Sequence, residues 1–367
     1  MGGVTSCQSA PIIAEAPIIV EGDDASNQDR LAIRQQEGAG LRAVALEPTT
    51  DYQVQLDPTF QVTRPWHIVF VSKDGPKGHD HYSIGQCGSS IWCQIWEGAQ
   101  QAGAIAGAEV ELAYVPTECS ENYECTTAQI QLLDHLIHRG DVDGIVLGPR
   151  ESNLLVPVVE KAIAAGIPVL ITDTPLNTEQ VVTQVLPDDH QMGKSLARWV
   201  VNHLQDNGNV LLLNGPETQA NALNRKSGIL AGLSTGKIRV LDIQYAEWTA
   251  QEAESITQQW LTEFSDIDAI MAGSGDLALG VVNALNAQAQ SDMLITSFDV
   301  YPQIQAALTS GAIDVTVDQR LSLQGQLGVQ VLLRYLEEKE DLPPIIHVPN
   351  IRLLMKETTD TGMPSGS

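Results

Sequence analysis

The sequence predicts an α/β protein built from two doubly wound, parallel-sheet lobes. The chain has 367 residues, whereas an average domain has about 150. Short apolar runs alternate with segments of helical periodicity, which is typical of parallel sheets covered by helices on both faces. The alternation restarts near the middle of the chain. One sheet containing all these strands would be unusually large, so two lobes fit the length better.

The first expected strand is Trp66–Ser72, a nearly continuous apolar run of the kind that forms a strand buried on both faces. The rest of the first half is expected to form strands at 109–115, 144–147 and 167–171, with helices at 126–139 and 153–165. In the second half, strands are expected at 209–213, 238–245, 268–272 and 293–298, with helices near 189–205, 221–234, 250–264 and 276–288.

Both ends of the chain are expected to lie outside the folded body. Residues 1–63 lack strong periodicity and mix Pro, Gly, Gln and acidic residues, so they predict a flexible tether. Residues 359–367 predict a flexible tail. If the first three residues replace a removed signal peptide, Cys7 is a candidate lipid anchor; an ordinary surface cysteine is the alternative.

The charge of the chain excludes several classes of partner. The sequence has 46 acidic and 20 basic residues, a formal net charge of -26. Such a surface repels nucleic-acid phosphates and anionic lipids, so neither is an expected partner. No stretch of about 18 apolar residues is present to span a bilayer.

Four further cysteines form two equally spaced pairs, Cys87 with Cys93 and Cys119 with Cys125. Their spacing is not that of paired CxxC zinc motifs, so we expect four disulfide-bonded cysteines and an oxidising compartment. Four cysteines allow three connectivities. Two local bridges are the simplest pairing, and bridges between the two loops remain open.

Polar side chains follow several of the expected strands. Ligands of doubly wound sheets bind beyond the carboxyl ends of the strands, which makes these positions candidates for a binding site. Carboxylates and amides hydrogen-bond hydroxyl groups in fixed directions, and tryptophan faces can stack on a sugar ring. Helix capping, turns and core packing are the alternatives. The candidates are Lys73, Asp74, Asp173, Ser274, Asp299 and Gln319, with the aromatic side chains of Trp92 and Trp248.

From Trp66 to Thr358 the chain resembles the type I periplasmic binding proteins, especially the ribose-binding family. No single motif decides this, but the order and spacing of the motifs are specific. The segments that carry the resemblance are Trp96–Ala102, Asp143–Gly148, Ala165–Asp173, Leu277–Gly280, Ser297–Asp299 and Thr316–Gln319.

The resemblance implies a role for individual residues. Asp173 and Asp299 match carboxylates that bind sugar hydroxyls from the two lobes, and Gln319 matches a hinge amide that touches the ligand. Trp92 matches an aromatic that stacks on the ring, and Ser89 a polar contact. The chain departs from the family where Leu223 stands in place of a ligand-binding Arg and Ser274 in place of Asn. Lys73 and Arg225 are cations that could enter the site and restore a preference for anions.

The resemblance also implies that the chain crosses between the lobes three times, near Leu186-Pro187, Gln319-Arg320 and Pro349-Asn350. The expected N-terminal lobe comprises residues 64–186 and 320–349. The expected C-terminal lobe comprises residues 187–319 and 350–358. Closure of the lobes about this hinge would trap the ligand.

These features imply an extracytoplasmic solute-binding protein, expected to be a monomer, that captures a sugar or similar polyol without a cofactor, a metal or catalysis. Its partner would be the membrane permease of an ABC importer or, alternatively, a membrane sensor kinase or chemoreceptor. A cationic ligand is the second choice of ligand class.

Among other classes of protein, an NAD-dependent enzyme is a remote alternative, because Gly273–Ala278 fits G-x-G-x-x-A and Asp299 ends the next strand. A metal site at His79 and His81, and a repressor core without its DNA-binding headpiece, are weaker alternatives.

Overall fold

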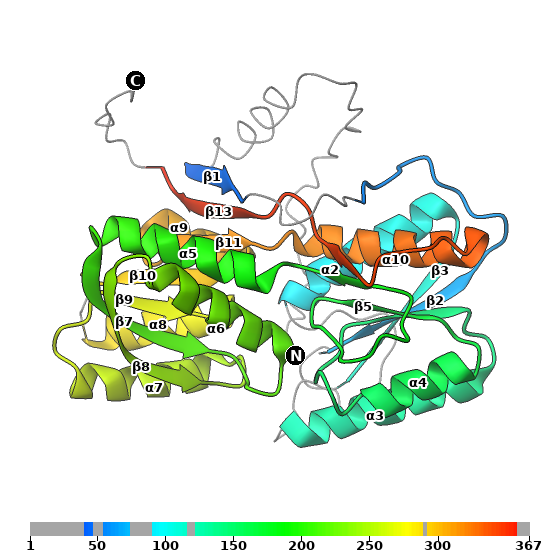
Figure 1. Ribbon diagram of the computed structural model, residues 1–367, viewed down its shortest axis with the longest axis horizontal. Helices are drawn as coiled ribbons and strands as arrows, with labels where there is room; N and C mark the ends of the chain where they lie inside the picture. The colour runs from blue at the N-terminus through cyan, green and yellow to red at the C-terminus, as the bar shows by residue number, and fades with distance from the viewer. Residues whose placement is uncertain (1–39, 47–53, 74–89, 116–121, 289–291, 358–367) are drawn as a thin grey trace, which may run out of the picture.

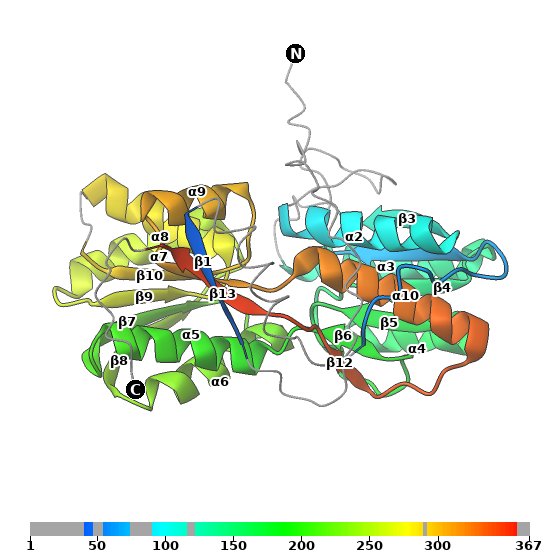
Figure 2. The same ribbon diagram turned by 90° about the horizontal axis from the view of Figure 1, so that it is seen from above.

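The computed structural model describes residues 40–46, 54–73, 90–115, 122–288 and 292–357, which fold into two lobes (Figure 1). Each lobe is a largely parallel sheet between layers of helices, and the lobes lie side by side (Figure 2). The predicted fold class is confirmed.

The N-terminal lobe contains a six-stranded parallel sheet in the order β12-β6-β5-β4-β2-β3. Phe70 packs with two helices on one face, and its neighbours Val69 and Val71 pack with two others on the opposite face. This two-sided burial is why the first strand has an almost continuous apolar sequence. The strands are β2 (His67–Ser72), β3 (Glu109–Tyr114), β4 (Gly144–Leu147), β5 (Val169–Thr172), β6 (Gln184–Leu186) and β12 (Ile345–His347); α2 (Ser90–Ala106) and α10 (Leu321–Glu338) cover one face, and α3 (Asn122–Arg139) and α4 (Val156–Ala164) the other.

The C-terminal lobe contains a seven-stranded sheet in the order β1-β13-β11-β10-β9-β7-β8. Its strands are parallel except β13, which runs antiparallel to both of its neighbours. The strands are β1 (Leu41–Ala45), β7 (Asn207–Asn214), β8 (Lys237–Tyr245), β9 (Ala269–Ala272), β10 (Leu294–Phe298), β11 (Val315–Asp318) and β13 (Arg352–Lys356); α5 (Asp189–His203) and α6 (Ala220–Leu233) cover one face, and α7 (Ala250–Glu263), α8 (Gly275–Gln288) and α9 (Pro302–Ser310) the other.

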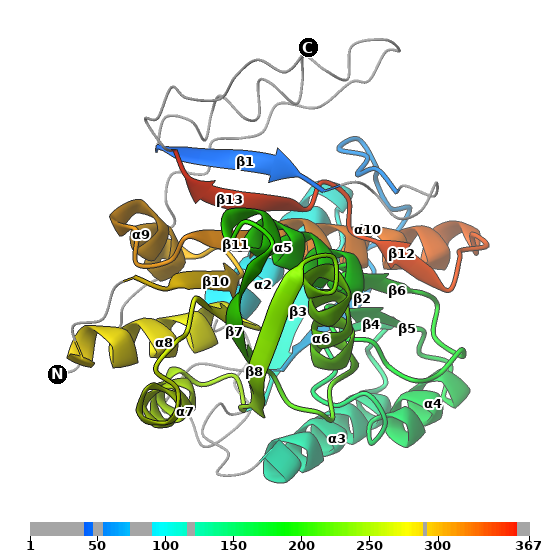
Figure 3. The same cartoon turned by 60° about the vertical axis from the view of Figure 1, so that its left-hand side comes forward.

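Two parts of the segment before the first predicted strand are described by the structure, residues 40–46 and 54–66, and we call them together the N-terminal strap. Its β1 pairs antiparallel with β13 along five residue pairs (Figure 3). Farther on, the strap crosses to the N-terminal lobe, where the backbone N–H of Asp57 donates to Gln330 Oε1 at 2.8 Å and that of Val62 to the Ala106 carbonyl at 2.9 Å. The structure therefore differs from the expected flexible tether at residues 40–46 and 54–63. The partners of the strap lie far away in the sequence, so no local pattern marks it.

The strap adds a crossing to those expected. The chain passes between the sheets from β1 to β2, from β6 to β7, from β11 to β12 and from β12 to β13. The first of these crossings is the strap, and the other three lie near Leu186-Pro187, Gln319-Arg320 and Pro349-Asn350.

Cys93 on α2 and Cys125 on α3 are buried and disulfide-bonded. Cys7, Cys87 and Cys119 lie outside the described residues, so the connectivity and the lipid anchor stay predictions, and so does any metal at His79 and His81. Within the described residues, no group of histidine, cysteine and acidic side chains is suited to hold a metal ion. None of the helices described there is long and apolar enough to cross a membrane.

Candidate ligand-binding site

Two aspartates directly follow strands in opposite lobes. Asp173 follows β5 and Asp299 follows β10, and both are nearly buried, with 7% and 3% exposure. Each has a left-handed backbone conformation, with φ of 66° and 71°. Aspartate tolerates this conformation better than most residues because its short side chain can hydrogen-bond locally. Burial raises the pKa of Asp299, and the charge of Asp173 in the opposite lobe adds to this effect.

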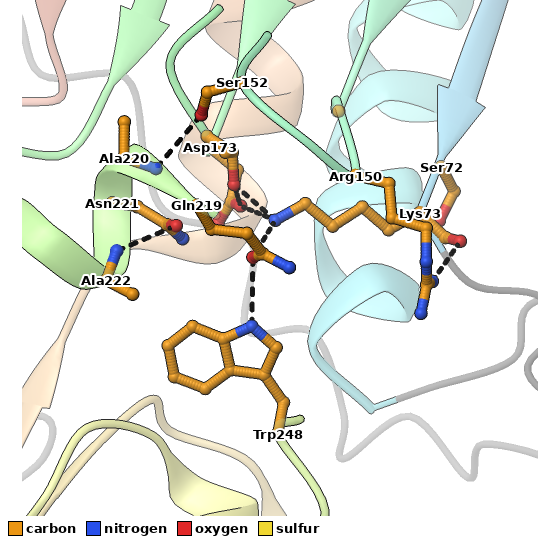
Figure 4. A network of polar contacts seen from close by, with 12 residues as sticks. Ser72, Lys73, Arg150, Ser152, Asp173, Gln219, Ala220, Asn221, Ala222 and Trp248 are labelled. Atoms are coloured by element: carbon orange, nitrogen blue, oxygen red, sulfur yellow. Dashed lines mark hydrogen bonds and ion pairs between the residues drawn. The ribbon is translucent and has the colours of Figure 1, made fainter. Parts of the chain in front are cut away.

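Lys73, at the end of β2, binds Asp173 and reaches the other lobe (Figure 4). Its Nζ lies 3.3 Å from Asp173 Oδ2 and 3.3 Å from Oε1 of Gln219, and it also donates to Thr174 Oγ1. Thr174 in turn donates its hydroxyl hydrogen to Asp173 Oδ2 at 2.8 Å. Gln219 precedes α6 in the C-terminal lobe, so the ammonium group connects the lobes.

Trp248, after β8, completes this part of the site. Its indole Nε1 donates to Gln219 Oε1 at 3.0 Å. The ring lies so close to the backbone of Gly215 that an added Cβ would be 2.0 Å from two of its carbon atoms. A glycine at the end of β7 is therefore required for this position of the ring. Trp248 is half-buried, which leaves part of the ring accessible.

A second polar network joins Arg225 to the hinge. The guanidinium donates to Asp189 Oδ1 from Nε at 3.0 Å and from Nη2 at 2.6 Å. Nη1 donates to the Gly273 carbonyl, and Nη2 lies 3.4 Å from Oε1 of Gln319. Burial raises the pKa of Asp189 to about 7, against the opposing effect of Arg225.

Gln319 connects Arg225 to Asp299. Its Nε2 donates to Asp299 Oδ1 at 2.6 Å, and the backbone N–H of Gly275 donates to Oδ2 at 3.2 Å. Burial raises the pKa of Asp299 to about 6; Asp173 and Asp276 add to the effect, and Arg225 and the Gly275 N–H oppose it. The carboxyl group is thus held by neutral donors in a buried position.

Further contacts join the lobes around the site. The backbone N–H of Ala220 donates to Ser152 Oγ at 3.0 Å (Figure 4). Gln94 on α2 donates to the Val300 carbonyl at 2.8 Å. Together with the contact between Lys73 and Gln219, these bonds join the two lobes where the carboxyl ends of their strands face each other.

The structure places five of the sequence-predicted residues in the two polar networks. They are Lys73, Asp173, Arg225, Asp299 and Gln319. Leu223 is 38% exposed, whereas Arg225 is 3% exposed and faces the network, so the site contains a cation although Leu223 replaces the family's Arg. Both cations considered in the sequence analysis, Lys73 and Arg225, lie in these networks.

Two other predicted residues have structural partners. Ser274 accepts a hydrogen bond from the Leu277 N–H at 3.2 Å, as a helix-capping serine does. Trp92 is 2% exposed and packs against Gly148 and Phe70 in the core. Its ring centroid lies 5.7 Å from Lys73 Nζ, at the border of the site. Stacking of Trp92 on a ligand stays a prediction. Asp74 and Ser89 lie outside the described residues.

Sequence reasoning missed Thr174, Asp189 and Gln219. Thr174 directly follows a candidate aspartate, and Asp189 lies at the first hinge crossing, so both positions carried a signal. Gln219 had none, because it lies at the beginning of a helix, five residues beyond the end of β7.

The comparisons with known proteins agree with this architecture. A family model described as periplasmic binding protein domain matches residues 82–340. The D-ribose/D-allose-binding protein of Pseudomonas aeruginosa is 28% identical over 218 residues, which cover 58% of this chain and 68% of that protein. The xylitol-binding protein of Mycolicibacterium smegmatis is 30% identical over 214 residues, 58% of this chain and 61% of that protein, so this chain matches less than two thirds of its length.

Solved structures show the same fold. An ABC transporter solute-binding protein of Actinobacillus succinogenes with bound D-allose superimposes with a TM-score of 0.69 at 21% identity, over 80% of this chain and 98% of that chain. One from Agrobacterium radiobacter with D-arabinose superimposes with a TM-score of 0.70 at 20% identity, over 82% and 97%. With the family model covering most of the chain, the protein belongs to the periplasmic binding protein family.

Proposed function

We propose that the protein is an extracytoplasmic solute-binding protein that closes on one small, uncharged, polyhydroxylated ligand, a sugar or a polyol, and catalyses no reaction. One observation carries the proposal. Asp173 and Asp299 follow strands of opposite lobes with the same backbone conformation, and each is held by donors of its own lobe. Relatives named for D-ribose and D-allose, xylitol and D-apiose support this class of ligand.

The contacts of Asp173 leave room for a ligand hydroxyl. Lys73 and Thr174 both donate to Oδ2, and no described residue donates to Oδ1. Oδ1 can therefore accept a hydrogen bond from a ligand hydroxyl, while Lys73 and Thr174 occupy Oδ2.

The charges around the site favour a neutral ligand. Lys73 and Arg225 pair with Asp173 and Asp189, which leaves Asp299 with only neutral donors. A phosphate or carboxylate on the ligand would meet this third acid in a site of low dielectric constant. A compact cation is the second candidate, because Asp299 would attract it.

A thermal-shift screen followed by calorimetry tests the proposal. The panel comprises neutral pentoses, hexoses, polyols and cyclitols, the corresponding sugar phosphates, and amines. We expect a neutral polyol to raise the melting temperature with the logarithm of its concentration above the dissociation constant. Preferential stabilisation by a sugar phosphate would contradict the charge argument, and preferential stabilisation by an amine would favour the second candidate.

We also propose that the ligand is delivered to the permease of an ABC importer, with the protein tethered by a lipid on Cys7. Membership of the family and the names of its relatives support the importer. A strain that lacks the gene should lose uptake of the radiolabelled ligand. Retained uptake with loss of a transcriptional or chemotactic response would favour a membrane sensor kinase or chemoreceptor instead. Mass spectrometry of the mature N-terminus tests the lipid.

A further inference from the structure

We infer that Gln219 is a specificity-determining residue, whose amide nitrogen donates a hydrogen bond to an oxygen atom of the ligand. This inference rests on the proposed function and deepens it. Gln219 is 2% exposed and lies at the contact between the lobes. Of the two polar atoms of its side chain, only Oε1 has hydrogen-bond partners in the described part of the chain.

The orientation of the Gln219 amide is fixed by two donors. Oε1 accepts from the Lys73 ammonium at 3.3 Å and from the Trp248 indole at 3.0 Å. Neither donor can accept a hydrogen bond. Rotation of the amide by 180° would place its NH₂ group against both of them, so the observed orientation is the one that the chemistry allows.

The fixed orientation presents the NH₂ group as a donor. Figure 4 shows Nε2 directed between the Lys73 side chain and the Trp248 ring. No described residue accepts a hydrogen bond from it, although the side chain is almost completely buried. An acceptor on a bound molecule can therefore take the hydrogen bond of this donor.

This donor discriminates between the candidate ligand classes. A hydroxyl group can accept from Gln219 Nε2 through its oxygen, and it or a neighbouring hydroxyl can donate to Asp173 Oδ1. An alkylammonium group has no lone pair and cannot accept from Nε2. An anionic oxygen can accept, but it meets the carboxylates of the site. The pair of Gln219 and Asp173 therefore selects a neutral diol.

Two substitutions separate the donor from the rest of the side chain. Gln219→Glu keeps an acceptor for Lys73 and Trp248 but removes the NH₂ group. Gln219→Leu removes donor and acceptor without adding charge. The matched control is Gln326→Glu on α10, where the glutamine binds Gln101 at the surface. Melting temperatures and small-angle scattering verify that each variant is folded with its lobes in the usual arrangement.

Calorimetry is performed with D-allose, D-ribose and xylitol, and the tightest binder of the unsubstituted protein is followed. We expect both Gln219 variants to bind it about tenfold more weakly and the control to bind it normally. Normal binding by Gln219→Leu would overturn the inference. A loss of affinity confined to Gln219→Glu would also overturn it, because the added negative charge would then be the cause.

Monodeoxy analogues of the same ligand identify the acceptor. One analogue should bind the unsubstituted protein more weakly and lose no further affinity with Gln219→Leu. If Gln219→Leu weakens the binding of every analogue by the same factor as it weakens the binding of the parent ligand, Gln219 does not contact the ligand. Binding of none of the three probes, with tight binding of an amine, would overturn the proposed function and this inference together. Tight sugar binding without dependence on Gln219 would overturn this inference alone.

Discussion

Asp173 and Asp299 occupy equivalent positions in the two lobes but have opposite electrostatic surroundings. Both follow a parallel strand and have a left-handed backbone. Asp173 is paired with the ammonium of Lys73, whereas Asp299 is bound by the amide of Gln319 and the N–H of Gly275. A cation therefore lies against one carboxylate, whereas the other is bound by neutral donors.

We therefore expect ligand affinity to fall on acidification. The pKa of Asp299 is raised to about 6 in the folded protein, from an ordinary value of 3.8. A ligand hydroxyl that donates to the ionised carboxylate loses that acceptor as the pH falls through about 6. Calorimetry from about pH 7.5 to pH 5 should show the loss, and Asp299→Asn should bind weakly with a flatter pH profile. An unchanged affinity at pH 5 would contradict the assignment.

The same group should affect stability in the opposite direction. Its folded-state pKa is higher than its unfolded-state value, so the folded protein binds this proton more tightly. The contribution of Asp299 to the free energy of unfolding therefore falls as the pH rises from 3.8 to about 6, by roughly 3 kcal/mol. Urea unfolding of Asp299→Asn should lack this component, whereas the surface variant Asp266→Asn should retain it.

Removal of one member of the Lys73–Asp173 pair should destabilise the N-terminal lobe. Their side chains are only 9% and 10% exposed. Asp173→Asn removes the carboxylate from this buried ion pair and keeps a residue that tolerates the left-handed backbone. We expect a loss of about 3 kcal/mol in the free energy of unfolding. The double variant Lys73→Met with Asp173→Asn should recover most of it. Equal stability of Asp173→Asn and the unsubstituted protein in chemical denaturation would show that the pair is solvated.

The Trp248 ring offers a test that substitutes no polar side chain. In Gly215→Ala the new Cβ must displace the ring, because it would lie 2.0 Å from the ring carbons. The indole then loses its bond to Gln219, and we expect affinity to fall about tenfold with a change in tryptophan fluorescence. The control is Gly328→Ala on α10, where the nearest side-chain atom is 3.1 Å away. Normal binding by Gly215→Ala would show that the ring has no role.

The features that could be predicted are those marked by a short stretch of neighbouring residues in the sequence. Buried parallel strands appear as apolar runs, and the residue after each run marks the carboxyl edge of the sheet, so Asp173, Asp299 and Lys73 could be located from the sequence. Arg225 was recognised as a candidate only beside Leu223, because the direction of a side chain on a helix depends on its packing. The burial of Trp92 against Gly148 depends on a tertiary contact that spacing does not reveal.

Gln219 and the N-terminal strap were missed for a different physical reason. Gln219 matters because Lys73 and Trp248 approach it from distant parts of the chain. Within the strap, β1 is a short strand that pairs with β13, near the other end of the sequence. In both cases the information lies in contacts of large sequence separation.

Truncation tests the importance of the strap. Deletion of residues 1–46 removes β1, with its buried Leu41 and Ala43, from the edge of β13. We expect a loss of about 2–3 kcal/mol in the free energy of unfolding. Deletion of residues 1–39 is the matched control, since it leaves β1 intact. Equal melting temperatures for the two truncations would show that β1 contributes nothing to the C-terminal lobe.

The pairing of β1 with β13 also has a consequence for the order in which the protein folds. Strands β12 and β13 are the last of the chain, and each adds to a different sheet. A chain that is delivered with its N-terminus first has no partner for β1 until residues 352–356 arrive. Until then β6 lacks its neighbour β12 and β11 lacks its neighbour β13, so each is an edge strand. Contacts of such large sequence separation fold slowly. Both lobes therefore stay incomplete until the whole chain has been delivered, which favours a chain that crosses a membrane unfolded and folds afterwards.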